Sequence, residues 1–432
     1  MPAFAFFTIA AVVAVTLAWG ALFASLDPIE FAAWVVRREI LLGLLGLNAA
    51  VGLFRMVAVA DAHSGAGGRP ISIGLVAALL FVALPHAGLG WVQVRGYQAL
   101  TSVFQPASQP PPIVALATTS STTSTTSVPA TDVGGSTTTT TTPATTTTTP
   151  GPSRLTVLLL GSDAGPYRSG VRTDTVMVVS LDTVNGDLAI FGLPRNLSGL
   201  AFEDGLKVPG ILNTVYGFGT QRPDRFPGVD PGASALIEIS EHITGLTIDH
   251  YVMVDMLSFV DVVDALGGVT MYVPVAVYDD LYETDRNAAP GIYFPVGYQE
   301  FDGSDALAYV RTRRYSSDYS RMARQRCVIA AMADQLDPAS LLRGLPRLLS
   351  TFEENVDTDI PFDLLPDLIR LLGVVDMDNA IAVGFTPPDW TIGPNRPDIP
   401  RIREAVALAI TDPAAAVELF SIEVTGSSCG PG

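Results

Sequence analysis

Hydrophobic and polar positions divide the 432-residue chain into three zones. Residues 1–100 are almost continuously apolar, residues 101–153 are almost only Thr, Ser, Pro, Ala and Gly, and residues 154–432 mix apolar and polar positions as globular domains do. No polar face recurs at helical spacing in the first zone, which favours transmembrane helices over the buried helices of a soluble protein. Its apolar runs each approach the roughly 20 residues that a bilayer requires, and they cover residues 3–26, 40–60 and 71–94.

The second zone includes the stretch "TTSSTTSTTSVPATDVGGSTTTTTTPATTTTTP". Such a segment cannot bury enough apolar surface to offset its chain entropy, so we expect a disordered, solvated linker. Ser/Thr/Pro-rich stalks are typical of extracytoplasmic proteins. The pattern predicts an anchor of about three transmembrane helices in residues 1–100, a linker in residues 101–153, and an extracytoplasmic domain in residues 154–432 that is held well away from the cell membrane. Three spans with an external C-terminus require a cytoplasmic N-terminus.

The third zone opens with a short apolar run at residues 154–160 and then a predicted β-hairpin. Its strands, 175–181 and 188–193, are rich in β-branched and large apolar residues, and Asn185-Gly186 between them is a strong hairpin signal. A two-residue loop would place Val176 opposite Arg195. The polar triplets 172–174 and 194–196 then meet at the open end of the hairpin, as either a surface ion pair or part of a site.

Strands and helices alternate after this hairpin. The patterns predict helices over 230–244 and 256–266 and strands over 248–254 and 269–273. A leading hairpin followed by alternating elements indicates an α/β fold with a mixed sheet flanked by helices.

The charge balance of 25 basic against 43 acidic residues gives a net charge of −18, which argues against a nucleic-acid partner. All basic residues but Lys207 are arginines, and six of them crowd into residues 311–326. A helix that begins at Asp318 would place Asp318, Arg321 and Gln325 on one face, and an extended backbone would aim Arg311 and Arg313 to one side. A solvated helix face is the alternative, but a one-sign array of arginines is typical of a phosphate site.

The chain has two cysteines, Cys327 and Cys429. In an oxidising compartment they could form one bridge that ties the C-terminal tail to the core. Two unpaired thiols remain an open alternative, because Cα separations cannot be read from a sequence. No histidine is placed by the sequence to activate either thiol, so neither is expected to be catalytic.

These residues resemble the LytR-CpsA-Psr family of bacterial cell-wall glycopolymer ligases. The resemblance runs over about residues 155–337 and is carried by the motifs "LLLGSD", "RTDTVMVVSLD", "LPRN", "KVPGILNTVYGFG", "LTIDHYVMVDMLSFVDVVDALGGV" and "FDGSDALAYVRTRRYSSDYSRMARQR". It implies an extracytoplasmic α/β domain of the LytR-CpsA-Psr type. This domain would bind a polyprenyl-pyrophosphate-linked glycan and transfer the phosphoglycan to a peptidoglycan hydroxyl with Mg²⁺ or Mn²⁺. Hydrolysis of the lipid pyrophosphate at the same site, or a non-enzymatic wall-binding or regulatory role, are the alternatives.

The resemblance also implies roles for individual residues. Asp163 and Asp174 match acids that are associated with the metal. The implied catalytic residues are Asp174, Arg195, Arg311, Arg313, Asp318 and Arg321. The implied substrate-binding residues are Arg172, Lys207 and Gln325. An apolar groove between sheet and helices is expected for the lipid, with 176–179 and 252–256 as candidate segments.

The sequence departs from the family pattern at three places. The usual Pro-Arg-Asp triplet reads Pro-Arg-Asn, so Asn196 replaces a carboxylate. Most members of the family have one membrane span where this chain has three predicted spans, and the long Thr-rich linker is atypical.

Overall fold

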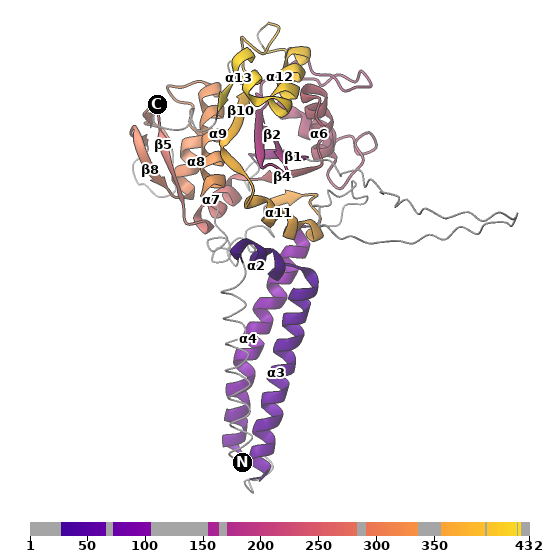
Figure 1. The fold of residues 1–432 in the computed structure, drawn as a ribbon, viewed down its shortest axis with the longest axis vertical. Coiled ribbons are helices and arrows are strands. Elements are labelled where there is room, and N and C mark those ends of the chain that lie inside the picture. Colours follow the sequence, from indigo (N-terminus) through magenta and orange to yellow (C-terminus); the bar gives the residue numbers. More distant parts are fainter. Residues whose placement is uncertain are drawn as a thin grey trace, which may run out of the picture.

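The computed structural model describes residues 27–65, 72–104, 154–163, 171–282, 291–335, 356–393, 395–420 and 422–424. A globular α/β part rests on the end of a pair of long helices (Figure 1). The first predicted span, residues 3–26, and residues 105–153 of the predicted linker lie outside the described residues.

The two long helices are α3 (Arg38–Gly65) and α4 (Ile73–Val103), and both are long and apolar enough to cross a membrane. They include the second and third predicted spans, and α4 extends beyond residue 100, where the linker was expected to begin. Asn48 on α3 and His86 on α4 join them through a hydrogen bond from Asn48 Nδ2 to the His86 carbonyl oxygen (3.0 Å) and a contact between the two side chains (2.8 Å). The pair indicates membrane anchoring, since polar contacts between apolar helices hold such hairpins together.

The central sheet has seven strands within the described residues, in the order β11-β10-β3-β2-β1-β4-β9. β1 pairs antiparallel with β2 and parallel with β4, so the sheet is mixed, as predicted. The strands are β1 (Arg154–Ser162), β2 (Thr173–Asp182), β3 (Asp187–Gly192), β4 (His250–Val254), β9 (Val356–Thr358), β10 (Asp376–Gly384) and β11 (Glu423–Val424).

The predicted register of the β2–β3 hairpin is wrong by two residues. Val178 pairs with Phe191 and Met177 with Gly192, and Val176 lies beside Leu193 rather than Arg195. The loop has four residues, because Oδ1 of Asp182 accepts hydrogen bonds from the backbone N–H groups of residues 184 and 185. A shift of two residues keeps each side chain on the same face, so the two polar triplets still meet.

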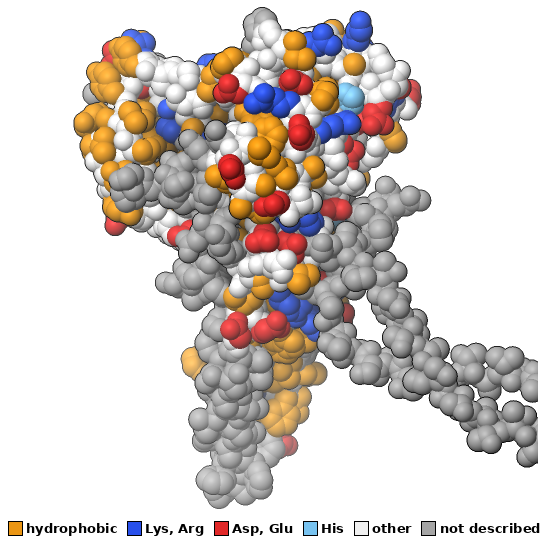
Figure 2. Space-filling view, turned by 45° about the horizontal axis from the view of Figure 1, so that its top comes forward, with side chains coloured by type: hydrophobic (Ala, Val, Ile, Leu, Met, Phe, Trp, Pro, Cys, Tyr) orange, Lys and Arg blue, Asp and Glu red, His pale blue; other side chains and the backbone are white. Residues whose placement is uncertain are grey.

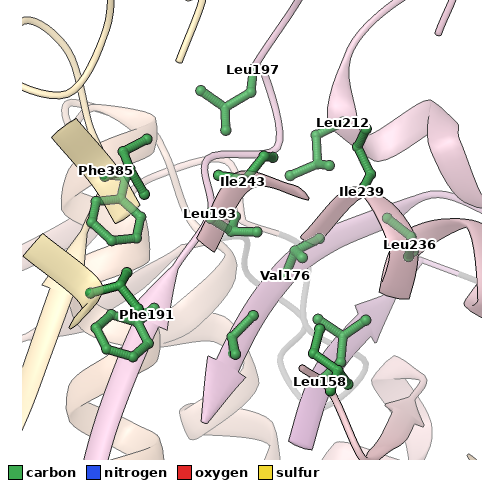
Figure 3. Close-up of a cluster of buried hydrophobic side chains, with 14 of the residues drawn as sticks. Leu158, Val176, Phe191, Leu193, Leu197, Leu212, Leu236, Ile239, Ile243 and Phe385 are labelled. Carbon is green, nitrogen blue, oxygen red and sulfur yellow. The ribbon is translucent and has the colours of Figure 1, made fainter. Parts of the chain in front are cut away.

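Helices cover both faces of the sheet (Figure 1). One face packs against α6 (Pro231–Thr244) and α12 (Ile399–Thr411), with α5 (Val215–Thr220), the 3₁₀ turn η1 (Leu212–Thr214) and α13 (Pro413–Phe420) around them. Figure 3 shows this core, in which Leu158, Val176 and Phe191 of the sheet meet Leu236 and Ile239 of α6.

The opposite face packs against α9 (Asp318–Asp334), which is followed outward by α8 (Gly303–Arg311) and α7 (Met256–Ala265). Two small sheets complete this lobe, β5 (Val269–Val273) with β8 (Gly297–Phe301), and β6 (Val277–Asp279) with β7 (Ile292–Phe294). Hydrophobic side chains gather on its surface (Figure 2). Tyr298 of β8 is exposed. Cys327 on α9 is disulfide-bonded, and Cys429 lies outside the described residues.

The anchor contacts the globular part directly, which contradicts the expectation that the domain is held well away from the membrane. The short helix α2 (Pro28–Val35) packs on α11 (Leu365–Leu372), where Nε of Arg370 lies 3.0 Å from Oε1 of Glu30. Ala33 of α2 is fully buried. Tyr97 near the end of α4 meets the ring of Phe362 in η2 (Phe362–Leu364) edge to face, with ring centroids 6.4 Å apart.

Candidate active site

A cavity of about 490 Å³ lies between the sheet and helices α7, α8 and α9. Its wall has two parts. One part is charged or polar and is lined by Ser162, Asp163, Asp174, Thr175, Asp255, Arg311, Arg313, Arg321 and Gln325. The rest is mainly apolar and includes Leu159, Val252, Val254, Met256, Phe259, Val262, Leu307, Val328, Ile329 and Met332. The cavity therefore suits a ligand with an anionic head and a hydrocarbon tail.

Asp174 reaches this cavity from an irregularity in β2. Gly161 pairs with Thr175 and Ser162 pairs with Thr173, so Asp174 is an extra residue between two paired positions. Such β-bulges bend a strand and redirect a side chain, and they are frequent next to active sites. A Cβ atom on Gly161 would lie 2.8 Å from Cβ of Thr175, so the bulge depends on a glycine there.

Arg195 connects Asp174 to the start of α9. Its Nη1 donates to Oδ1 of Asp174 at 2.6 Å, and its Nη2 lies 3.3 Å from Oδ1 of Asp318. Asn213 donates to the same Asp174 oxygen at 3.4 Å, and the backbone N–H of Asn213 donates to the carbonyl of Arg195. The two polar triplets of the hairpin thus belong to one network with η1 and α9.

Asp318 is the centre of the arginine cluster. α9 begins at Asp318, as predicted, and Ser317 caps it by accepting a hydrogen bond from the N–H of Ser320. Oδ1 of Asp318 lies 3.2 Å from Nη2 of Arg321 and 3.9 Å from Nη1 of Arg313. One largely buried carboxylate therefore orients arginines that line the cavity, although Asp318 itself does not line it.

The charges fix the ionisation of the site. Burial acts to raise the pKa of Asp174, but the Arg195 hydrogen bond, the positive charges of Arg195 and Arg321 and the Asn213 hydrogen bond outweigh it, and the pKa is lowered. Burial lowers the pKa of Arg321, which the neighbouring Asp318 partly counteracts. Asp174 is therefore a carboxylate at neutral pH, and the positive charges of Arg195 and Arg321 balance its negative charge.

The six arginines of residues 311–326 do not act together. Arg311 ends α8 instead of lying on extended backbone, yet it lines the cavity with Arg313 and Arg321. Arg324 is buried beneath α8 and donates through Nε to the carbonyl of Tyr309 at 2.7 Å, so it satisfies the end of that helix. Arg314 pairs with Asp280, outside the cavity lining.

Of the other predicted site residues, Asp163 and Gln325 line the cavity and Arg172 and Lys207 do not. Oδ1 of Asp163 accepts a hydrogen bond from the backbone N–H of Arg172 at 2.9 Å, while the Arg172 side chain is exposed. Gln325 donates to the carbonyl of Val310 at 3.4 Å. Lys207 is exposed, in a segment that pairs with Ala201.

Asn196, which stands where the family pattern has an acid, is directed to another part of the fold. Its Nδ2 donates to Oδ1 of Asn395 at 3.3 Å, and it is absent from the cavity lining. Its Oδ1 is buried without a hydrogen-bond partner among the described residues. The substitution therefore lies beside the charged network and not within the cavity wall.

The sequence reasoning missed most of the apolar lining. Residues 176–179, proposed for the groove, do not line it, whereas Val252, Val254 and Met256 of the second candidate segment do. Val176 faces the opposite core (Figure 3), and Val178 belongs to the same core. A signal was available in α9, because its lining residues follow Arg321 on one helical stripe at positions 325, 328, 329, 332 and 333.

The donor set fits a hard divalent cation that is shared with a phosphate ligand. Asp163 and Asp174 line the same end of the cavity, and both hydrogen bonds to the Asp174 carboxylate from described residues end on Oδ1. Within the described part of the chain no group of three or more His, Cys, Asp or Glu residues could hold a metal. Mg²⁺ is commonly held by one or two carboxylates together with substrate phosphates and water, so two acids suffice for it.

The chain is similar to known cell-wall proteins. It is 27% identical over 226 residues to the polyisoprenyl-teichoic acid–peptidoglycan teichoic acid transferase TagV of Bacillus subtilis, which covers 52% of this chain and 54% of TagV. It is 29% identical over 204 residues to the cell wall biosynthesis protein LcpA of Corynebacterium glutamicum, which covers 44% of this chain and 38% of LcpA. The chain thus spans about half the length of the first relative and less of the second.

The crystal structure of B. subtilis TagV aligns with a TM-score of 0.45 at 25% identity, over 59% of this chain and 95% of that chain. The family model described as "LytR_cpsA_psr family" matches residues 118–380, which is more than half of the sequence. The chain belongs to the LytR-CpsA-Psr family.

Proposed function

We propose that this protein transfers a phosphoglycan from a polyprenyl-pyrophosphate carrier to a hydroxyl group of peptidoglycan. The observation that carries the proposal is the two-part cavity, whose lining combines three arginines and three carboxylates with an apolar wall. A pyrophosphate fits the first part and a polyprenyl chain fits the second. TagV, a relative by sequence, is named a polyisoprenyl-teichoic acid–peptidoglycan transferase.

In the proposed reaction, an acceptor hydroxyl attacks the phosphorus that bears the glycan. A new P–O bond forms to the acceptor, the P–O bond to the bridging oxygen breaks, and polyprenyl phosphate leaves into the apolar part of the cavity. Arg311, Arg313 and Arg321 hold the phosphate oxygens and stabilise the developing charge. Asp174, ionised and in the cavity wall, accepts the proton of the hydroxyl, whereas Asp318 is enclosed by arginines and orients them.

Asp163 and Asp174 are the residues that would hold Mg²⁺ or Mn²⁺, which would supply further neutralisation at the phosphate oxygens. The two long helices support a location at the cell membrane. A third span in residues 3–26, with a cytoplasmic N-terminus and an extracytoplasmic catalytic part, completes the proposed topology, since peptidoglycan lies outside the membrane.

The test uses the full chain in lipid nanodiscs with a polyprenyl-pyrophosphate glycan, peptidoglycan and Mg²⁺. The wild type should yield peptidoglycan that carries covalently bound phosphoglycan. The double variant Arg311→Ala/Arg313→Ala should lose at least about 100-fold in rate, since each charge-assisted contact contributes about 1.5–3 kcal/mol. Arg401→Ala, which removes an exposed arginine outside the cavity lining, is the matched control.

Three results would contradict the proposal. Failure of the wild type to form a covalent product would exclude transfer to this acceptor. Release of the glycan phosphate into water, with no transferred product, would identify a lipid-pyrophosphate phosphatase. Unchanged cell-wall function in a strain that carries Asp174→Ala would favour a non-enzymatic role.

A further inference from the structure

The loop that presents Arg313 to the cavity contains a strained aromatic residue. Tyr315 has φ = 59°, and within the described residues it is the only non-glycine residue with a positive φ. The left-handed region is unfavourable for a residue with a bulky side chain, and such conformations persist only where the surroundings enforce them. Tyr315 does not line the cavity itself, but it follows by two positions Arg313, which lines the charged part.

Contacts to the β6 region hold this loop in place. The hydroxyl of Thr312 donates to Oδ2 of Asp279 at 2.5 Å, and both residues are buried. Asp280 pairs with Arg314 and accepts a 3.5 Å contact from the hydroxyl of Tyr315. Asp279 therefore holds the loop on the N-terminal side of Arg313, through Thr312. Asp280 holds it on the C-terminal side, through Arg314 and Tyr315.

The ring of Tyr315 is fixed but remains open to solvent. It stacks on the ring of Tyr278, with centroids 5.9 Å apart and planes at 9°, and the guanidinium carbon of Arg314 lies 5.2 Å from its centroid. Tyr315 is nevertheless 73% exposed and Tyr278 49% exposed. We call these two rings, together with Asp280 and Arg314 at their edge, the tyrosine ledge. The strained backbone at Tyr315 does not serve to place its ring in a buried core, because both rings are largely exposed.

The position of the ledge limits what it can bind. In the proposed function the phosphate lies against Arg311 and Arg313, so the sugar attached to that phosphate, or the sugar whose hydroxyl attacks it, lies next to this end of the cavity. A pyranose ring has a face of C–H groups, which pack on an aromatic ring, and an edge of hydroxyl groups, which hydrogen-bond to carboxylate and guanidinium groups. The ledge offers both, with two nearly parallel, stacked rings that are open to solvent and the Asp280–Arg314 pair beside them.

We propose that the tyrosine ledge is a subsite for a sugar ring of the glycan adjacent to the reacting phosphate. The proposal rests on the proposed function for the identity of the phosphate ligand. The sugar belongs either to the lipid-linked donor or to the peptidoglycan acceptor, and the same chemistry serves both.

The experiment compares the full-length wild type in nanodiscs with Tyr315→Gly and Tyr315→Phe. Glycine accepts a positive φ without strain, so Tyr315→Gly removes the ring while the loop keeps its backbone. Tyr315→Phe keeps the ring and tests whether stacking suffices. Titration calorimetry measures binding of a polyprenyl pyrophosphate without sugar, of the same lipid with a disaccharide, and of peptidoglycan glycan oligomers.

We expect Tyr315→Gly to bind the sugar-free lipid as the wild type does and to lose at least about tenfold in affinity for one sugar ligand, with Tyr315→Phe within about threefold of the wild type. Loss for the lipid-linked disaccharide assigns the subsite to the donor, and loss for the glycan oligomers assigns it to the acceptor. Equal affinity of wild type and Tyr315→Gly for both sugar ligands overturns the proposal. An equal loss for the sugar-free lipid also overturns it, since the loop would then only position Arg313. Failure of the wild type itself to bind sugar-free lipid would instead count against the proposed function.

Discussion

Nη1 of Arg195 lies 2.6 Å from Oδ1 of Asp174, so a residue just beyond β3 neutralises a carboxylate that a bulge in β2 turns into the cavity. The two residues are opposite each other if the observed β2–β3 pairing is continued past Gly192. The two-residue loop expected from Asn185-Gly186 would have placed Arg195 beside Val176 instead. The four-residue loop therefore places Arg195 directly opposite Asp174.

The Arg195–Asp174 pair predicts the response of the site to acid. The pKa of Asp174 is lowered in the folded protein, so its ionisation stabilises the fold above the unfolded pKa of about 3.9, and this contribution is lost as pH falls through the folded pKa. Arg195→Gln leaves burial, which raises the pKa, and removes the largest opposing contacts. We expect the loss of both thermal stability and transfer rate on acidification to begin at higher pH than in the wild type.

The measurement is the melting temperature and the transfer rate between pH 3 and pH 7. Arg225→Gln is the matched control, because Arg225 pairs with Asp204 and Glu238 outside the cavity lining. If the pH at which stability and transfer rate decline on acidification is the same in Arg195→Gln and the wild type, the decline is not caused by protonation of Asp174.

Asp318 predicts a loss of stability together with a loss of substrate affinity. Its carboxylate lies among Arg195, Arg313 and Arg321, and its side chain is 19% exposed. Asp318→Asn leaves these positive charges facing one another, and removal of one partner of a largely buried ion pair costs about 3 kcal/mol. We expect a lower melting temperature and a higher KM for the lipid donor, because the arginines lose their fixed orientation.

Thermal unfolding and steady-state kinetics check this, with Asp367→Asn as the control. Asp367 also pairs with an arginine, Arg370, but at the surface, where an ion pair contributes about 0–1 kcal/mol. Equal effects of the two substitutions would show that Asp318 has no special role in the cluster.

How far the sequence predicts the structure depends on the range of the interaction. The helix that starts at Asp318 and places Arg321 and Gln325 on one face follows from a local 3.6-residue period, and the structure has it. The β-bulge at Asp174 has no local signal, since it depends on the fit of Gly161 against Thr175 on the next strand. The hairpin loop was predicted too short because Asp182 competes for the backbone of the turn through its side chain.

Contacts between distant segments cannot be predicted from local sequence patterns. Glu30 and Arg370 are 340 residues apart, and neither lies in a sequence motif that predicts its partner. Asn213 was visible only as part of a resemblance, and its hydrogen bond to Asp174 appears once residues 195–198 and 211–213 lie side by side.

The apolar wall of the cavity predicts selectivity for the lipid tail. Met332 lines it from α9 and is partly buried, so Met332→Trp narrows the groove without adding charge. We expect a KM at least about tenfold higher for a long polyprenyl donor. The binding affinity for inorganic pyrophosphate, which has no tail, should change little. Leu419→Trp, at a position that is 70% exposed, controls for the added indole. Equal weakening of tailed and tail-free ligands would indicate that the substitution disturbs the charged end as well.

The contact between the anchor and the globular part predicts coupling between α2 and α11. Ala33 of α2 is fully buried, and overpacking a buried position costs about 1–3 kcal/mol, so Ala33→Trp should separate α2 from α11 and weaken the Glu30–Arg370 pair. Amide hydrogen exchange of the full chain in nanodiscs should then be faster in Leu365–Leu372, whereas the core strands β1 and β2 should keep wild-type protection. Ala49→Trp, an exposed position on α3, should leave α11 unchanged. If exchange in α11 is the same in all three proteins, the globular part does not depend on α2 for its position, and the cavity is not held at a fixed orientation to the membrane.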